Sequence, residues 1–295
     1  MYETMIVPLD GSRAAEMVIP YAEEVAAKLG SQMILVSVSE SLPANMEQLY
    51  QAYLEHITQQ VQRQLKDWKP KKEAQVQSKV LTGKPADEIL RYADDTNAGL
   101  IAMTSRGSSV RESWPLGNIA AKVLRATTKP LIFVRAPASE DAVRQKRLVK
   151  RILVPLDGSE LGAAAIPHAE ALGQALGAEL VLFQAIDPAA VQRLPSEGVS
   201  YTRAVAVDMQ KVLSTEYLNG VRKTLKEKGL EVSSAIAVGS PPDQIVDYAK
   251  ANAIDLITMS SHGRTGIRRW VFGGVTDKVL HSGDTAVLVV PAPKV

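Results

Sequence analysis

The chain has 295 residues, about two domains' worth at roughly 150 residues each. Hydrophobic residues make up 46% and charged residues 22%, an ordinary globular balance, and 19 Gly and 16 Pro are too few for a collagen-like or disordered chain. The 34 Lys and Arg against 32 Asp and Glu give a formal charge of +2, which offers no support for a nucleic-acid partner or a membrane-surface partner.

The sequence contains no cysteine, which excludes disulfides, thiolate metal sites and a cysteine nucleophile. Residues 1–10 run directly into an apolar segment, without the basic and apolar regions of a signal peptide. No apolar stretch approaches the length of about 18 residues that a membrane helix needs. We therefore expect a cytoplasmic protein without a membrane partner.

Short apolar runs alternate with longer segments of helical periodicity along the first half of the chain. Strands are expected at 4–9, 32–38, 74–81, 99–104 and 131–134. Helices are expected near 13–29, 44–68, 85–96 and 117–127. Strands separated by helical segments are typical of βαβ units, which build parallel sheets.

The second half repeats the first. Ile-Val-Pro-Leu-Asp-Gly-Ser at 6–12 returns as Leu-Val-Pro-Leu-Asp-Gly-Ser at 153–159, and Gly83-Lys84-Pro85 matches Gly239-Ser240-Pro241. The change in spacing between these matches places nine extra residues in the second copy, between about 188 and 231. We predict a first domain at 1–137, a basic linker at 138–150 and a second domain at 151–295.

The second copy has the same alternation of elements as the first. Strands are expected at 150–156, 179–186, 231–238, 255–260 and 286–290. Helices are expected near 160–176, 201–228, 241–252 and 273–281. The sequence thus predicts two tandem doubly wound, Rossmann-like α/β domains, each with a five-stranded parallel sheet. Ligands bind such sheets beyond the carboxyl ends of the strands, where the strand order reverses.

An acidic residue follows the first strand of each copy, in Asp10-Gly11-Ser12 and Asp157-Gly158-Ser159. A carboxylate there can accept a hydrogen bond from an amino group or a ribose hydroxyl, or approach a metal. Alternatively, Asp and Ser only form the strand-to-helix turn, with Ser as the N-cap. Neither a dinucleotide fingerprint nor a Walker A loop follows these strands, which disfavours dehydrogenases and P-loop ATPases.

A glycine-rich loop follows the fourth strand of the second copy, from Ser260 to Gly274. Its glycines and the helix start after them favour a polyphosphate cradle, and a mobile surface loop with solvated arginines is the alternative. At Gly263 a side chain is expected to block the approach of the backbone to phosphates and to disfavour a positive φ. The matching first-copy loop, Thr104 to Asn118, has fewer glycines, so we expect tighter binding in the second copy.

The Val-Pro-x-Asp strand end, the Gly-x-Pro after the third strand and the glycine-rich loop together resemble the universal stress protein family over the whole chain. The resemblance implies a strand order of 3-2-1-4-5 and the nucleotide-binding motif G-x2-G-x9-G-[ST]. The second copy reads Ser260-x2-Gly263-x9-Gly273-Gly274, and the first reads Thr104-x2-Gly107-x9-Gly117-Asn118. Both copies differ from the motif at its first glycine and at its last Ser or Thr.

By this resemblance the ligand is an adenine nucleotide, ATP, with or without Mg²⁺. Asp157 and the backbone at Ala185 would hold adenine and ribose. The phosphates would lie on the loop and the helix start, within reach of two basic side chains. The loop positions are Ser260, His262, Gly263, Arg264, Gly273 and Gly274. For His262, packing within the loop is the alternative role.

The matching first-copy positions would form a weaker site. They are Asp10, Val38, Gly107, Gly117 and Asn118. Asn118 is expected to act as the cap of the helix that follows it. We assign no catalytic residue and no metal ligand.

The function that these patterns favour is a regulatory module that binds ATP, mainly in the second domain, without efficient catalysis. An interaction scaffold with degenerate nucleotide sites and a slow ATPase are the alternatives. The two copies resemble a family dimer made covalent, with edge strands 131–134 and 286–290 in contact. Further dimerisation of the chain is left open.

Overall fold

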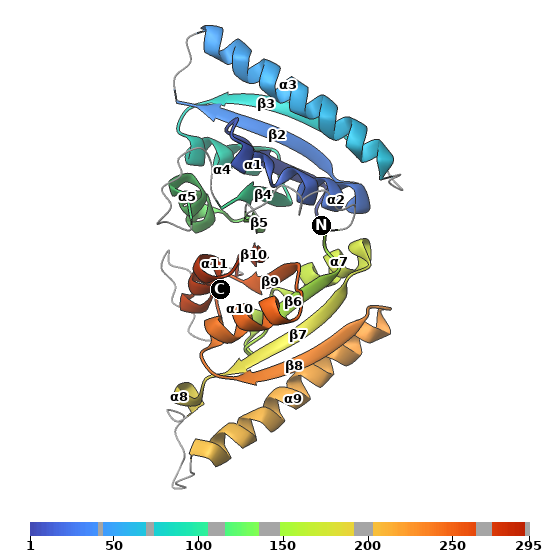
Figure 1. Cartoon of the computed structure of the whole chain (residues 1–295), viewed down its shortest axis with the longest axis vertical. Helices are drawn as coiled ribbons and strands as arrows, with labels where there is room; N and C mark the ends of the chain where they lie inside the picture. Colours follow the sequence, from blue (N-terminus) through green and yellow to red (C-terminus); the bar gives the residue numbers. More distant parts are fainter. Residues whose placement is uncertain are drawn as a thin grey trace. The chain divides into compact units, whose positions relative to one another are not determined.

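The computed structural model describes residues 1–40, 44–68, 74–105, 116–135, 148–191, 203–263 and 273–292. The chain divides into two compact units (Figure 1). The first comprises Met1–Val149 and Ala286–Pro291, and the second comprises Lys150–Thr285 and Ala292–Val295. Each unit is an α/β structure, as the alternating periodicity predicts.

The first unit contains a mainly parallel sheet in the order β3-β2-β1-β4-β5. Its described strands are β1 (Thr4–Pro8), β2 (Gln32–Ser39), β3 (Val76–Thr82), β4 (Leu100–Thr104), β5 (Leu131–Val134) and β10 (Ala286–Val290). Its described helices are α1 (Arg13–Glu16), α2 (Ile19–Leu29), α3 (Ala44–Asp67), α4 (Pro85–Asp95) and α5 (Asn118–Ala126).

Strand β10 comes from the second sequence copy but groups with the first unit. It pairs antiparallel with β5, with Leu288 opposite Ile132. The pairing joins the two edge strands that the sequence analysis expected to be in contact. All five residues of β10 are buried, so the β5 edge is covered rather than left open.

The second unit repeats this order with β8-β7-β6-β9, all parallel. Its strands are β6 (Arg151–Pro155), β7 (Glu179–Ile186), β8 (Val232–Val238) and β9 (Leu256–Ser260). Its described helices are α6 (Glu160–Ala163), α7 (Ile166–Leu176), α8 (Pro188–Val191), α9 (Arg203–Glu227), α10 (Pro241–Ala251) and α11 (Gly274–Ser282). The predicted fold class, tandem doubly wound α/β domains, is confirmed.

Helices flank the strands of each sheet. Helix α3 packs along β3 and β2, and α9 packs along β8 and β7 (Figure 1). Strands β4 and β9 are buried at every residue. Such continuous apolar runs are typical of parallel strands that are covered on both faces.

Two helices that the periodicity predicts as continuous are interrupted. The segment 13–29 divides into α1 and α2, and the segment 160–176 divides into α6 and α7. Pro20 and Pro167 lie in the first turn of α2 and α7. A proline lacks an amide hydrogen and clashes with the carbonyl four residues earlier, so α1 and α6 end at those carbonyls.

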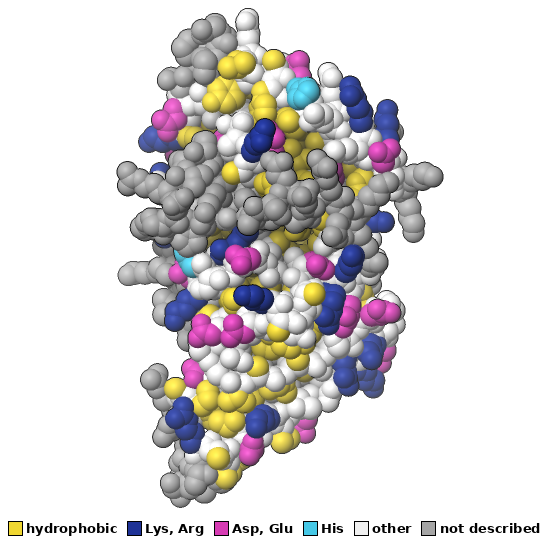
Figure 2. Space-filling view, in the orientation of Figure 1, with side chains coloured by type: hydrophobic (Ala, Val, Ile, Leu, Met, Phe, Trp, Pro, Cys, Tyr) yellow, Lys and Arg dark blue, Asp and Glu magenta, His cyan; other side chains and the backbone are white. Residues whose placement is uncertain are grey.

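Helix α9 carries hydrophobic side chains on its exposed surface. Val205, Met209, Val212 and Leu213 are 44–59% exposed, and Figure 2 shows hydrophobic side chains at the surface over α9, in the lower part of the view. Their spacing places them on one stripe of the helix, where a surface helix usually carries polar residues. Within the described ranges, no helix is long and apolar enough to span a membrane.

Helix α2 contributes two buried carboxylates to the first unit. Glu24 accepts hydrogen bonds from the amides of Leu148 and Val149, at 2.9 and 3.1 Å. Glu23 is 5% exposed, and Gln64 of α3, with its amide turned to donate, lies 3.1 Å from Glu23 Oε2. Burial raises the pKa of Glu23 from 4.5 to about 8.

Because folded Glu23 holds its proton more tightly than the unfolded chain does, it stabilises the fold most at low pH. We expect this contribution to fall as the pH rises from 4.5 to about 8, by an amount on the order of a few kcal/mol. Glu23→Gln should remove this part of the pH dependence. Urea unfolding of both proteins between pH 5 and 8 tests it, and parallel pH profiles would contradict it.

Candidate nucleotide site

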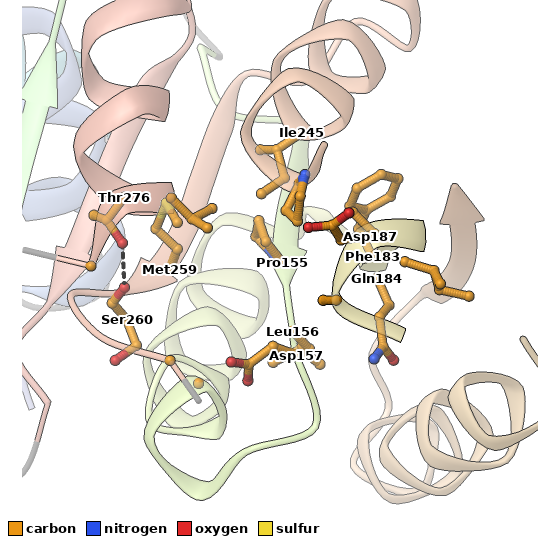
Figure 3. Close-up of a pocket in the computed structure, with 18 of the residues that line it drawn as sticks. Pro155, Leu156, Asp157, Phe183, Gln184, Asp187, Ile245, Met259, Ser260 and Thr276 are labelled. Carbon is orange, nitrogen blue, oxygen red and sulfur yellow. Dashed lines mark hydrogen bonds between the residues drawn. The ribbon is translucent and has the colours of Figure 1, made fainter. Parts of the chain in front are cut away.

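The ends of β6, β7 and β9 and the start of α11 surround a cavity of about 420 Å³ in the second unit (Figure 3). Cavities of this size hold small ligands in many proteins. Seven of the sequence-predicted site residues line it. They are Asp157, Ala185, Ser260, His262, Gly263, Gly273 and Gly274.

Asp157 forms a tight turn at the end of β6. Its Oδ1 accepts hydrogen bonds from the amide and the hydroxyl of Ser159, at 3.0 and 2.6 Å. The Ser159 hydroxyl in turn accepts from the amide of Gly162 at 3.0 Å, as the N-cap of α6. Gly158 between them has a φ of 80°, which glycine adopts without strain. Asp157 and Ser159 therefore form the strand-to-helix turn with Ser159 as the N-cap. The same hydrogen bonds fix the Asp157 carboxylate at the cavity.

Two glycines pack against the Asp157 carboxylate. A Cβ on Gly162 would lie 2.4 Å from Oδ1, and a Cβ on Gly263 would lie 2.3 Å from Oδ2. Both distances are far below van der Waals contact. The chain after β9 therefore approaches the end of β6 this closely only because residue 263 has no side chain.

The expectation that Gly263 needs a positive φ is wrong. The glycines with positive φ are 11, 30, 83, 158, 177, 229 and 239 among the residues that the structure describes. Gly263 is described but has another backbone conformation. Its requirement for glycine comes from the nearby carboxylate, which a local sequence pattern does not reveal.

The start of α11 forms one side of the cavity. Gly273 is the N-cap, and no side chain caps this helix. The first amides of an α-helix have no partner within the helix and carry the positive end of its dipole. Thr276 Oγ1 donates to the carbonyl of Ser260 at 3.0 Å, and the Gly273 amide donates to the carbonyl of Ser261 at 3.0 Å. These two bonds hold the helix start beside the end of β9.

His262 both lines the cavity and packs within its own segment. Its Nδ1 lies 3.0 Å from the Ser261 hydroxyl, which also accepts from the amide of Ala292 at 3.0 Å. Contact with a phosphate and packing within the loop, the two roles expected for His262, are therefore compatible.

The first-copy positions are placed differently. Asp10 makes the same turn, with Ser12 donating its amide to Oδ1 at 3.0 Å, but the aspartate is exposed whereas Asp157 is half-buried. Val38 lies in β2 and is half-buried. Gly107 and, in the second copy, Arg264 lie outside the described residues.

The expectation that Asn118 caps the next helix is wrong. Gly117 is the N-cap of α5 without a side-chain bond, and Asn118 is the first helical residue. The two copies therefore begin these helices in the same way, with glycine at the cap.

Sequence reasoning missed the walls of the cavity. Phe183, Ile245 and Met259 supply apolar surface, and Gln184 and Gln210 add polar side chains. The apolar residues follow ordinary core periodicity, so no signal distinguished them. Gln184 did carry a signal, because it interrupts the otherwise apolar run Leu180–Ile186.

Comparison with known proteins places this arrangement in a family. A model of the universal stress protein family matches residues 1–135 and 149–291. The chain belongs to the universal stress protein family.

Several members resemble the chain. A universal stress protein of Methanocaldococcus jannaschii is 31% identical over 149 residues, which are 50% of this chain and 86% of that protein. One of Mycobacterium tuberculosis is 25% identical over 215 residues, 72% of this chain and 68% of that protein. A solved universal stress protein from Archaeoglobus fulgidus has a TM-score of 0.67 at 19% identity and covers 99% of this chain and 97% of that one. At this low identity, the similarity to the Archaeoglobus fulgidus structure concerns the fold alone.

The contact between Gly263 and Asp157 yields a paired prediction. Gly263→Ala should lower the free energy of unfolding by about 1–3 kcal/mol, because its Cβ must displace the carboxylate. Gly274→Ala is the matched control, since a Cβ there meets no atom within 4 Å, and it should raise stability by about 0.4–1 kcal/mol. Urea unfolding measures both. Equal effects of the two substitutions would contradict this account of the site.

Proposed function

We propose that the second unit binds ATP in this cavity and that the chain acts as a cytoplasmic, nucleotide-responsive regulatory module without efficient turnover. The supporting observation is the order of chemical groups across the cavity. Figure 3 shows Ser260 and Thr276 on one side, Asp157 between, and Gln184 and Asp187 on the other side. From the α11 side to the β7 side, this order suits the phosphates, the ribose and the base of ATP.

The α11 side suits the phosphates. Uncapped amides at a helix N-terminus attract anions, and the dipole adds to the attraction. The Ser260–Gly274 loop corresponds to the nucleotide-binding motif of the family in all but its first and last positions. Arg264 would supply further positive charge, and Mg²⁺ would accompany the phosphates rather than occupy a site built by the protein.

The middle of the cavity suits a ribose. Asp157 uses Oδ1 in its own turn, and the packing of Gly162 and Gly263 fixes the direction of the carboxylate. A fixed carboxylate in a half-buried position is a strong acceptor for hydroxyl groups. The β7 side, with Phe183, Ile186 and Ile245, supplies the apolar surface against which a base can pack.

The second copy is proposed to be the tighter site. Asp10 occupies the same turn but is exposed, so water competes for its oxygens. The first copy also has Ala15 at the position of Gly162, which requires a different environment beside the carboxylate.

An interaction scaffold is the second candidate function. The exposed hydrophobic stripe on α9 favours it, together with the departures from the nucleotide motif at Ser260 and Gly274. A scaffold whose sites have degenerated would show no response to nucleotide.

Paired aspartate substitutions test the proposal. We expect Asp157→Ala to weaken ATP binding at least tenfold, a loss of about 1.4 kcal/mol or more, and Asp10→Ala to change it by less than about threefold. Calorimetric titration with ATP and Mg²⁺ measures both. ATP at about 100 times its Kd should also stabilise the native chain by about 2.7 kcal/mol.

The reverse pattern, with Asp10→Ala abolishing binding, would assign the site to the first copy. No binding by the native chain would favour the scaffold. Rapid ATP hydrolysis in the same samples would contradict the absence of efficient turnover.

A further inference from the structure

The cavity of the second unit extends between two helices that have counterparts in the first unit. Gly162 of α6 and Gln210 of α9 both line it, together with Asp157. Helix α6 follows the Asp157 turn as α1 follows the Asp10 turn, and α9 packs along its sheet as α3 does. A ligand in contact with Asp157 would therefore lie between α6 and α9. The equivalent space in the first unit is beside Asp10, between α1 and α3.

A hydrogen bond crosses this space in the first unit. The Tyr53 hydroxyl of α3 donates to Glu16 Oε1 of α1 at 2.9 Å, and both residues are half-buried. Burial raises the pKa of Tyr53 above its usual range, and the hydrogen bond to Glu16 and the negative charges of Glu16 and Asp10 raise it further. The hydroxyl therefore keeps its proton and remains a donor. The influence of Asp10 also places the pair close to the aspartate that would hold the ligand.

Helices α3 and α9 align residue by residue from their last turns. Tyr53 lies 14 residues before the end of α3 at position 67, and Leu213 lies 14 residues before the end of α9 at position 227. The residues that follow them, Leu54 and Ser214, are each 1% exposed. The two helices therefore turn the same face toward their sheets, and Leu213 is the counterpart of Tyr53.

The second unit has apolar residues at both positions of the pair. Glu16 corresponds to Ala163, at the spacing that relates the Asp-Gly-Ser turns of the two copies. The side chains of Ala163 and Leu213 carry no polar atom, so no side-chain hydrogen bond can join α6 to α9 at these positions. Leu213 is 58% exposed, whereas Tyr53 is half-buried.

We propose that the hydrogen-bonded pair of Tyr53 and Glu16 excludes the nucleotide from the first copy and so determines which unit binds it. This inference rests on the proposed function. A ribose or phosphate group beside Asp10 would have to break this bond and displace both side chains. Hydrogen bonds to a carboxylate are among the stronger ones in proteins, so the displacement lowers the affinity of the first copy. Ala163 and Leu213 impose no such cost in the second copy.

Exchanging the pair for its second-copy counterparts tests this assignment. The variant Glu16→Ala/Tyr53→Leu removes the bond, and it is made in a chain that also carries Asp157→Ala, so that ATP binding by the second unit is already weakened. Adding Asp10→Ala to this triple variant shows whether any recovered binding belongs to the first unit. The matched control is Glu55→Ala, which removes an exposed carboxylate from the same helix α3.

Calorimetric titration with ATP and Mg²⁺ measures the effect. Relative to Asp157→Ala alone, the triple variant should bind ATP about tenfold more tightly, and the control substitution should not change binding. The further Asp10→Ala substitution should remove the gain. With Asp157 intact, the exchange of the pair should add a second bound ATP per chain. A general loosening of the fold would not produce a gain of binding that depends on Asp10.

Three outcomes would overturn the inference. If the native chain binds ATP through Asp157 and the exchanged variants gain no binding, the pair does not determine the choice of copy, although the proposed function stands. If both copies of the native chain bind ATP with similar affinity, nothing excludes the nucleotide from the first. If neither the native chain nor the exchanged variants bind ATP, the proposed function fails and the inference fails with it. Should the double exchange not fold, Glu16→Ala alone decides, because Ala163 already fits the corresponding position.

Discussion

The geometry of the candidate site depends on the close packing of one carboxylate. Asp157 ends β6, caps its own turn through Ser159, and contacts the backbone at Gly162 and Gly263, where no Cβ intervenes. Two segments that are distant in sequence, the turn between β6 and α6 and the chain after β9, thereby meet at a single side chain. This contact holds the chain after β9 against the end of β6, while the Thr276–Ser260 and Gly273–Ser261 bonds hold the start of α11 beside it, and the cavity lies next to these segments.

Duplication gives this protein an internal comparison. Both copies keep the Asp-Gly-Ser turn and begin the later helix with a glycine cap. They differ in what surrounds the turn, with Ala15 against Gly162 and Ser37 against Gln184. The Ser37 hydroxyl donates to the carbonyl of Leu9, while the Gln184 side-chain oxygen is left without a partner. The differences thus concern the site and leave the framework unchanged.

Periodicity and the internal repeat were sufficient to predict the α/β class and every strand that the structure describes. They missed the division of 13–29 and 160–176 into two helices each, although Pro20 and Pro167 were visible in the sequence. The expected contact between strands 131–134 and 286–290 agrees with the pairing of β5 and β10, which groups β10 with the first unit. Strand partners at that distance depend on which edges remain open after the local βαβ units have formed.

The sequence by itself determined which residues follow the strands, and hence that Asp157, Ser260, Gly263 and Gly273 share one edge of a parallel sheet. That follows from chain direction and from the alternation of strand and helix. Only the tertiary structure decided why residue 263 must be glycine and that the Gln184 oxygen is buried without a partner. Both depend on atoms brought together from distant segments, and neither a backbone conformation nor a local pattern records such contacts.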